Sequence, residues 1–453
     1  MAQKLFGTDG IRGTVNSSKM TAPLAMHVAM AIGLRRREQG IAVRPEVLIA
    51  KDTRQSGYML ENAMVAGFTS VGFDVLLLGP MPTPAVASLT QSMRADLGIM
   101  LSASHNPYHD NGIKIFEATG YKIGSEIERQ IELDVARMVD EGIQFAVCPP
   151  QEVGRVRRLE ALGRYIELAK SSFPDHLSLN GLKVVIDCAH GAAYRCAPTA
   201  LYELGAEIVE IGNAPDGTNI NREFGATAPR NLQLEVIKTG ADVGVALDGD
   251  ADRLILVDER GQVVDGDQIM ALLVKTLHRR DKLKGEGLVT TVMSNLGLER
   301  RLAADNFKME RTRVGDRFVL ERMRALGWNV GGEQSGHMIL SDYATTGDGL
   351  IAGLQVLAEM AETGLKASEV LDQFEPVPQL LKNVQYKGTL PLDHQTVAAE
   401  IERQEARLRD TGRVVIRPSG TEPVIRVMAE ADDRDVVQEA VDSICRAIEK
   451  AQS

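Results

Sequence analysis

Short apolar runs, each followed by a glycine or polar turn and then by a helical pattern, recur along this chain and restrict its fold more than any other feature. The runs do not alternate apolar with polar residues, which is typical of strands buried on both faces of a sheet. Helical segments between such strands favour a mostly parallel α/β sheet. The predicted strands of this kind span 47–50, 75–78, 97–101, 184–186, 208–211, 243–247 and 288–292.

The chain is long enough for several domains, since 453 residues correspond to roughly three domains of about 150 residues each. Prolines in 148–150 and 375–378 mark two candidate linkers. The segment after the second linker holds a predicted strand pair, 413–417 and 424–429, flanked by helices. We therefore predict three α/β units followed by one smaller α+β unit.

Composition excludes several classes of function. Acidic residues outnumber basic ones by 62 to 51, a formal net charge of −11, whereas a nucleic-acid-binding protein should carry a basic surplus. Aromatic residues make up 4% of the chain, too few for base-stacking platforms. We see no signal segment, no apolar stretch near the ~18 residues that span a bilayer, and no C-x-x-C pair among the four cysteines. We expect a soluble cytoplasmic protein that binds neither nucleic acid nor membranes.

The sharpest candidate site is a loop with three carboxylates at every second position, Asp248, Asp250 and Asp252, between two predicted strands. Such a loop can curl around a cation, and oxygen ligands without His or Cys favour Mg²⁺ over zinc. An EF-hand is excluded because Arg253 stands where that loop requires glycine and because the flanks are predicted strands. A solvated turn would leave three acids repelling one another between apolar strands, so we predict a metal site.

A second candidate is Ser104, in the segment 102–107 that directly follows a predicted strand. Loops at strand ends are where α/β folds place reacting groups, so its hydroxyl is a candidate nucleophile or phosphate carrier. Ser104 or Asn106, before Pro107, would cap a helix equally well, and the spacing leaves both readings open. The segment lacks the G-x-S-x-G pattern of serine hydrolases, and the adjacent His105 points the wrong way in an extended segment to act as the base of Ser104.

Other loops offer polar groups for an anion or a sugar. The segment 417–423, together with Arg426, carries two guanidiniums and two hydroxyls around a glycine turn, which suits either a phosphate or a surface hairpin. The segment 331–337 contains Glu333, whose carboxylate can accept hydrogen bonds from sugar hydroxyls. The alternative is that this segment is a plain polar turn. Two further loops each contribute one cation, Arg12 and Lys114.

In this order, these segments resemble the α-D-phosphohexomutase superfamily, and within it the phosphoglucosamine mutase branch, over essentially the whole chain. Further matching segments are 51–54 (KDTR), 79–84 (GPMPTP), 314–317 (VGDR) and 345–349 (TTGDG). The resemblance implies a heart-shaped α/β architecture of four domains around a central cleft, three with mixed sheets and a smaller α+β domain at the C-terminus. The implied domains are 1–153 with a phosphoserine loop, 154–254 with a metal-binding loop, 255–374 with a sugar-recognition loop and 375–453 with a phosphate-binding loop.

The same resemblance implies a role for each candidate residue. Ser104 would be phosphorylated and exchange the phosphoryl group, and one of its phosphate oxygens would hold Mg²⁺ together with Asp248, Asp250 and Asp252. The reacting phosphate would be surrounded by Arg12, His105, Lys114 and Arg253, with His105 and Lys114 both candidates for the general base. Sugar hydroxyls would be bound by Glu333 and Ser335, and the phosphate that is not transferred by Arg417, Ser419, Gly420, Thr421 and Arg426.

The implied reaction interconverts glucosamine 6-phosphate and glucosamine 1-phosphate through a phosphoserine enzyme and a glucosamine 1,6-bisphosphate intermediate. It would feed UDP-N-acetylglucosamine and cell-wall precursor synthesis. The expected partner is a small hexosamine phosphate, and a homodimer is one candidate assembly. The alternatives are the same chemistry on glucose or mannose phosphates, a catalytically silent sugar-phosphate binding protein, and a metal-dependent phosphatase.

Two positions depart from the family pattern. Ala251 stands where many relatives have glycine, and His190 stands where asparagine is usual. The alanine would matter only if position 251 requires a positive φ, and the histidine affects secondary contacts alone.

Overall fold

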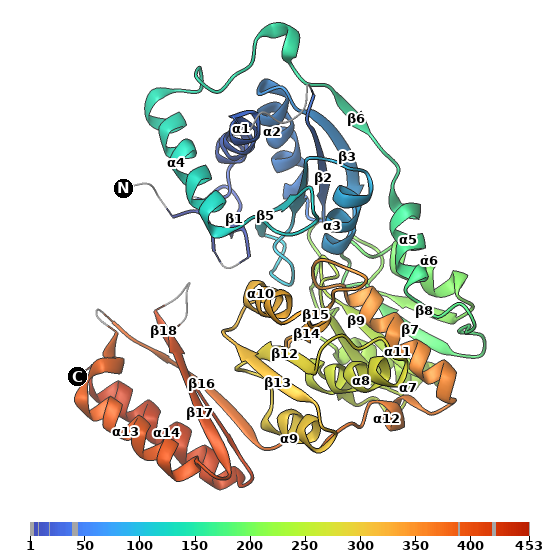
Figure 1. The fold of residues 1–453 in the computed structure, drawn as a ribbon, viewed down its shortest axis with the longest axis vertical. Helices are drawn as coiled ribbons and strands as arrows, with labels where there is room; N and C mark the ends of the chain where they lie inside the picture. The colour runs from blue at the N-terminus through green and yellow to red at the C-terminus, as the bar shows by residue number, and fades with distance from the viewer. Residues whose placement is uncertain are drawn as a thin grey trace.

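The computed structural model describes residues 4–7, 9–17, 19–38, 44–387, 390–418 and 423–452. These residues form four units, with the first at the top of Figure 1, the second and third below it, and the fourth at the lower left. Each predicted strand coincides with an observed one to within about a residue or two. The expected four-domain α/β architecture is confirmed.

The first unit is built on a six-stranded sheet. Its elements are β1 (Ile11–Thr14), α1 (Ala22–Glu38), β2 (Glu46–Lys51), α2 (Ser56–Ser70), β3 (Asp74–Pro80), α3 (Thr83–Ser92), β4 (Leu97–Leu101), β5 (Asp110–Glu117), α4 (Ser125–Glu141), a 3₁₀ turn (Pro150–Glu152) and β6 (Val156–Arg158). The strand order is β1-β5-β4-β2-β3-β6, and only β5 runs antiparallel to the other five strands. Val47 and Ile49 join the core formed with α1 and α2, whereas Leu48 and Ala50 join the core on the α3 side, as expected for a strand buried on both faces.

The second unit has a five-stranded sheet in which three parallel strands are extended by two antiparallel ones. Its elements are α5 (Leu162–Ser171), β7 (Lys183–Asp187), α6 (Cys196–Glu203), β8 (Glu207–Ile211), α7 (Arg230–Thr239), β9 (Val243–Leu247), β10 (Leu254–Asp258) and β11 (Val263–Val264). The strand order is β11-β10-β9-β7-β8. The aspartate loop 248–253 is the turn between β9 and β10, so the predicted strand flanks that excluded an EF-hand are confirmed.

The third unit has a four-stranded sheet in the order β13-β12-β14-β15, antiparallel only between the last two strands. Its elements are α8 (Gly266–Arg279), β12 (Gly287–Thr291), α9 (Leu296–Ala304), β13 (Lys308–Thr312), α10 (Asp316–Leu326), β14 (Val330–Gly332), β15 (Met338–Leu340), α11 (Gly349–Thr363) and α12 (Ala367–Val370).

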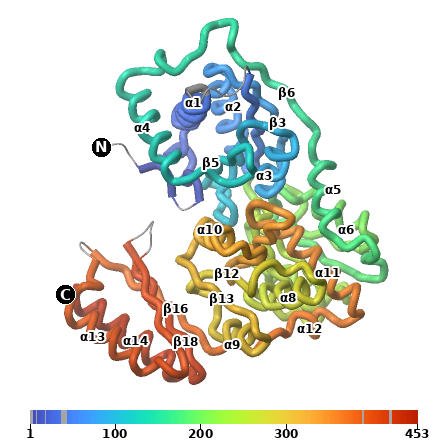
Figure 2. The backbone as a smooth tube through the Cα atoms, in the orientation of Figure 1, coloured from blue at the N-terminus to red at the C-terminus, as the bar shows by residue number. Residues whose placement is uncertain are grey.

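The fourth unit has a three-stranded antiparallel sheet in the order β16-β18-β17. Its elements are β16 (Gln379–Gln385), a 3₁₀ turn (Pro391–Asp393), α13 (Gln395–Leu408), β17 (Gly412–Pro418), β18 (Val424–Ala431) and α14 (Arg434–Lys450). The predicted strand pair is confirmed as β17 and β18, and the tube in Figure 2 shows both helices on one side of it.

The hydrophobic cores divide the molecule differently from the sheets. One large cluster runs through the first three units and includes Leu48, Leu254 and Leu354. The fourth unit has a core of its own, formed by its sheet with α13 and α14. It meets the third unit through polar contacts such as Arg413 Nη2 to the Ser294 carbonyl at 2.7 Å. The first three units are therefore one continuously packed body, and the fourth is joined to it at an edge.

Two sheets extend past predicted domain boundaries. β6 follows residue 153 yet pairs with β3, and β10 and β11, which reach past residue 254, complete the second sheet. The boundaries themselves stay predictions. Among the described residues, no helix has both the length and the apolar character needed to cross a bilayer.

Candidate active site

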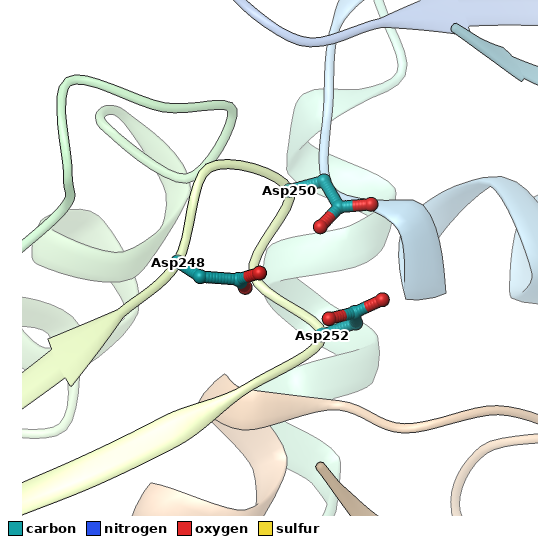
Figure 3. A group of neighbouring side chains, drawn as sticks. All are labelled: Asp248, Asp250 and Asp252. Carbon is teal, nitrogen blue, oxygen red and sulfur yellow. The ribbon is translucent and has the colours of Figure 1, made fainter. Parts of the chain in front are cut away.

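Ser104 and the aspartate loop belong to different units but meet at one buried point. Ser104 follows β4, is 1% exposed, and donates a hydrogen bond from Oγ to Asp248 Oδ2 at 2.6 Å. The carboxylates of Asp248, Asp250 and Asp252 lie near one another at the turn (Figure 3), and one oxygen from each lies within 4.8 Å of the others. The structure therefore brings the Ser104 hydroxyl into contact with a group of three carboxylates that could hold a cation.

The donor set fits a hard divalent cation. Asp250 Oδ1 and Asp252 Oδ1 are buried and have no hydrogen-bond partner among the described residues. Burial and the neighbouring charges of Asp252 and Asp250 raise the pKa of Asp248 to about 8. Unpartnered carboxylate oxygens in a buried, mutually repelling group call for a cation, and ligands that are all oxygen suit Mg²⁺.

Lys114, on β5, is the protein's own cation in this group. Its Nζ lies 2.8 Å from Asp250 Oδ2, 3.0 Å from Asp252 Oδ2 and 3.3 Å from Asp9 Oδ2. Burial alone would lower the pKa of Lys114, but these three carboxylates outweigh it and raise the pKa well above its ordinary value. Lys114 is therefore protonated near pH 7 and offsets part of the negative charge.

His105 lies beside the Ser104 hydroxyl, with its Nδ1 3.3 Å from Ser104 Oγ. The prediction that His105 points away from Ser104 is therefore wrong, because the left-handed φ of 53° at Ser104 means that the segment is not extended. Burial and the charges of Arg253 and Arg12 lower the pKa of His105 to about 4, so its ring is neutral near pH 7. Arg12 pairs with Asp9, while the Nε atoms of Arg12 and Arg253 are buried without a partner in the described part of the chain. Donors of this kind around a hydroxyl form a site for a phosphate.

The third unit contributes the loop between β14 and β15. Glu333 is half-buried and its Oε1 accepts a hydrogen bond from the backbone N–H of Gly315 at 3.1 Å, whereas Ser335 is exposed at the tip. His337 lies at the end of this loop, with Nδ1 3.7 Å from Asp252 Oδ1 and Nε2 3.7 Å from Asp316 Oδ2. The structure thus brings the third loop up to the aspartates.

The fourth unit contributes the β17–β18 hairpin. Arg417 and Arg426 are paired directly across the two strands. Burial and the charge of Arg426 lower the pKa of Arg417, and Glu333 opposes the shift. Arg417 Nε is buried without a partner in the described residues. The other three predicted phosphate-binding residues, Ser419, Gly420 and Thr421, lie outside the described residues.

Several residues of the site were not predicted. Lys122 pairs with Asp9 of its own unit and with Asp316 of the third unit, the latter at 2.5 Å between Nζ and Oδ2. Thr83 donates a hydrogen bond to Asp250, again between units. Thr83, Asp316 and His337 stood within the segments quoted above, but no local spacing reveals partners so distant in sequence.

Both departures from the family pattern lie at strained positions. Ala251 has a φ of 59° and is completely buried, so the condition under which the alanine matters is met. His190 has a φ of 49°, and its Nδ1 accepts a hydrogen bond from the backbone N–H of Ala214 at 3.2 Å. Its carbonyl accepts one from the Thr53 hydroxyl at 2.5 Å, across the boundary between the first two units.

Four family models match this chain in order. They are described as phosphoglucomutase/phosphomannomutase alpha/beta/alpha domain I over residues 3–140, domain II over 163–261, domain III over 265–377 and the C-terminal domain over 376–447. Among curated proteins, the phosphoglucosamine mutase of Xanthobacter autotrophicus is 57% identical over 453 residues, covering 99% of both chains. That of Novosphingobium aromaticivorans is 58% identical over 452 residues and covers 100% of both.

Solved structures share the fold at low sequence identity. A phosphoglucomutase/phosphomannomutase family protein from Burkholderia thailandensis has a TM-score of 0.81 at 24% identity, covering 100% of this chain and 98% of its own. The N-acetylphosphoglucosamine mutase of Aspergillus fumigatus, in complex with GlcNAc-6P and magnesium, has a TM-score of 0.67 at 18% identity, covering 99% of this chain and 96% of its own.

Proposed function

This chain belongs to the phosphoglucomutase/phosphomannomutase family, in its phosphoglucosamine mutase branch, and on that basis we propose that it interconverts glucosamine 6-phosphate and glucosamine 1-phosphate. The observation that carries the proposal is the 2.6 Å hydrogen bond from Ser104 to Asp248, which joins a buried hydroxyl to the aspartate loop of another unit. A catalytically silent sugar-phosphate binding protein needs neither the serine hydroxyl nor the aspartates at that point.

In the proposed reaction, Ser104 Oγ carries a phosphoryl group. The bond between Oγ and phosphorus breaks as the free hydroxyl oxygen of the sugar phosphate bonds to phosphorus, which produces the 1,6-bisphosphate; the sugar hydroxyl gives up one proton and the released Oγ takes one up. The bisphosphate then returns its other phosphoryl group to Ser104, whose hydroxyl gives up its proton, and the sugar oxygen that is released takes up a proton. Each cycle thus ends with Ser104 phosphorylated again and the sugar phosphate isomerised.

The charge of the site supports this chemistry. We assign Mg²⁺ to Asp248, Asp250, Asp252 and an oxygen of phosphorylated Ser104, where it supplies positive charge to the phosphoryl group. A phosphoserine adds about −1.5 to −2 charges, so together with three aspartates it exceeds what one divalent ion offsets. Lys114, Arg12 and Arg253 add positive charge near the same point, and fixed positive charge of this kind stabilises a transferring phosphoryl group. The neutral His105 ring adds no charge.

The remaining assignments concern the sugar phosphate. We assign Glu333 and Ser335 to sugar hydroxyls, and Arg417, Ser419, Gly420, Thr421 and Arg426 to the phosphate that is not transferred. The electrostatic influence of Glu333 on Arg417 supports a site shared by the third and fourth units. A cytoplasmic location, a homodimer and the place in UDP-N-acetylglucosamine synthesis belong to the same proposal.

Ser104→Ala tests the carrier role, with Ser92→Ala, an exposed serine of the same unit, as the matched control. We expect Ser104→Ala to lower turnover of glucosamine 6-phosphate by roughly 10³-fold or more and to remove the phosphate seen by intact-mass measurement of the purified protein. The control should match the wild type in both. Substantial turnover by Ser104→Ala would contradict the proposal, and faster turnover of glucose or mannose phosphates by the wild type would favour the alternative substrates.

A further inference from the structure

Ser104 has a backbone conformation that a serine does not adopt unaided. Its φ is 53°, in the left-handed region, and the residue is buried. A buried residue keeps such a conformation only when its surroundings hold it on more than one side. The contacts of its N–H and its C=O show what holds it.

The N–H side is held from within the first unit. The Ser104 N–H donates to Ser102 Oγ at 2.9 Å, and the Ser102 hydroxyl donates to Asp52 Oδ2 at 2.7 Å. Arg54 Nε donates to the same aspartate oxygen at 2.8 Å. Ser102, Asp52 and Arg54 are all buried, so water does not compete for these bonds.

The C=O side is held from two units at once. The Ser104 carbonyl accepts hydrogen bonds from Arg54 Nη2 at 2.8 Å and from Asn221 Nδ2 at 2.9 Å. The same two donors also reach the Asn106 carbonyl, at 2.8 Å and 3.1 Å. Asn221 belongs to the second unit, in the connection between β8 and α7, so it ties the serine loop to the unit that carries the aspartates.

The aspartate loop packs directly against this arrangement. A Cβ placed on Gly249, between Asp248 and Asp250, would lie 2.6 Å from the Ser104 carbonyl oxygen and 2.8 Å from Asn221 Nδ2. Both distances are shorter than real contacts of this kind, so only glycine fits there without movement. The backbone of the aspartate loop, the Asn221 amide and the Ser104 carbonyl therefore form one packed contact.

We propose that Asn221, acting with Arg54, is a positioning residue that fixes the Ser104 backbone to the aspartate loop, so that the serine oxygen and the metal site keep one relative position throughout the reaction. The inference rests on the proposed function, in which Ser104 carries the phosphoryl group. Loss of the Asn221 amide lets the serine loop relax away from Asp248 and slows transfer in both directions. The sugar-binding residues lie in the third and fourth units, so binding of the sugar phosphate is left intact.

Asn221→Asp and Asn221→Ala test this role together. Asn221 has a φ of 59°, which aspartate tolerates almost as well as asparagine. Asn221→Asp therefore removes the Nδ2 donor while keeping the side-chain shape and the backbone conformation. Asn221→Ala removes the donor without adding a charge, so an effect common to both variants reports the lost hydrogen bonds. The matched control is Asn213→Ala in the same unit, whose exposed amide donates to Glu210.

We expect both variants to lower kcat at least tenfold, to leave KM for glucosamine 6-phosphate within about twofold, and to raise the Mg²⁺ concentration that gives half-maximal activity. Intact-mass measurement should show Ser104 accepting a phosphoryl group from glucosamine 1,6-bisphosphate more slowly by a similar factor. Tm of Asn221→Asp should stay close to that of the wild type, whereas Tm of Asn221→Ala should fall slightly because alanine disfavours the left-handed backbone at this position. Asn213→Ala should match the wild type throughout.

Two results would overturn the inference while leaving the proposed function standing. One is a wild-type kcat in both variants. The other is a lower kcat, a higher KM and a much lower Tm together in Asn221→Asp, which a purely structural role produces. A wild-type protein with no turnover and no phosphate on Ser104 would overturn the proposed function, and this inference with it.

Discussion

At the scale of one residue, burying the Asp248 carboxylate beside two others lowers the stability of the folded protein. Burial and the charges of Asp252 and Asp250 raise the pKa of Asp248 to about 8, so the metal-free protein favours an uncharged side chain at this position. The charge is useful only when a cation and a phosphoryl group are present. Stability and activity should therefore respond in opposite directions when this charge is removed.

We predict that Asp248→Asn raises the free energy of unfolding of the EDTA-treated protein by on the order of 1 kcal/mol, because it removes one of three repelling carboxylates. The same variant should lose mutase activity with Mg²⁺ by roughly 10²-fold or more, because a negatively charged ligand is lost. Urea unfolding with EDTA and a steady-state assay over a range of Mg²⁺ concentrations measure the two effects. A variant that is both less stable without metal and fully active with it would refute the metal assignment.

Some residues of the site could be predicted from local sequence patterns, and others could not. Ser104 and the three aspartates were predicted because a strand end followed by closely spaced polar residues is visible in the sequence itself. Lys122 was not predicted, since a lone lysine is usually solvated and its partner Asp316 is 194 residues away. The left-handed φ of Ser104 was not predicted either, because it is imposed by packing between units.

Among the elements, the β17–β18 hairpin sets two arginines side by side. Arg417 and Arg426 face each other across the strands, and burial together with Arg426 lowers the pKa of Arg417. Like charges placed together in this way destabilise a hairpin unless an anion joins them. The arrangement is consistent with the phosphate role that we propose for the pair.

We predict that Arg417→Ala raises KM for the sugar phosphate by roughly 10- to 100-fold, through loss of a charge-assisted hydrogen bond of about 1.5–3 kcal/mol, while kcat changes less. Steady-state kinetics in both directions provide the measurement. Arg403→Ala, on the exposed face of α13, is the control and should match the wild type. If KM and kcat/KM of Arg417→Ala are both unchanged, the phosphate assignment fails.

Asp187, the last residue of β7, makes stability depend on pH. Its carboxylate accepts backbone hydrogen bonds from Ala189 at 2.9 Å and Gly225 at 2.7 Å, and burial nevertheless raises its pKa to about 6. Since the pKa in the unfolded chain is about 3.9, the folded state binds the proton more tightly. The stabilisation linked to this proton is fully present below about pH 4 and is lost as the pH rises through about 6.

We predict that the difference in free energy of unfolding, wild type minus Asp187→Asn, falls as the pH rises from about 4 to 7, because the variant lacks this titration. Urea unfolding of both proteins at several pH values measures it. Parallel pH curves for the two proteins would show that Asp187 has an ordinary pKa.

The strands themselves were predictable to different degrees. Uninterrupted apolar runs such as β4 and β9 are buried on both faces, and the sequence shows them plainly. β16 was missed because its polar residues interrupt the apolar pattern, whereas β17, at the opposite edge of the same sheet, was predicted. A strand without an uninterrupted apolar run lacks the signal on which the prediction depends.

For the whole molecule, Lys122 joins the first unit to the third. It lies between Asp9 and Asp316, and all three side chains are largely buried, with 15% to 18% of each exposed. Asp9 also contacts Lys114, so this bridge continues into the metal site. The relative position of the two units and the charge around the aspartates are thereby linked.

We predict that Lys122→Met lowers the free energy of unfolding by on the order of 3 kcal/mol, because the largely buried Asp316 loses its lysine partner and Asp9 keeps only Arg12 and Lys114. Lys122→Arg, which keeps the charge, should retain most of the stability. Urea unfolding at pH 7 compares the three proteins. A methionine variant as stable as the wild type would mean that the bridge is already open in solution.

Ser104 and Asp248 are 144 positions apart in the sequence, so they are synthesised at different times. At a synthesis rate of about 5–20 residues per second, the serine leaves the ribosome roughly 7–30 seconds before the aspartate that completes its surroundings. A nascent chain that ends before the second unit has emerged has no acid to pair with that hydroxyl and no Asn221 to hold its backbone. Under the proposed function, the newly made serine therefore cannot yet exchange phosphate, and it gains its partners only when the second unit folds against the first.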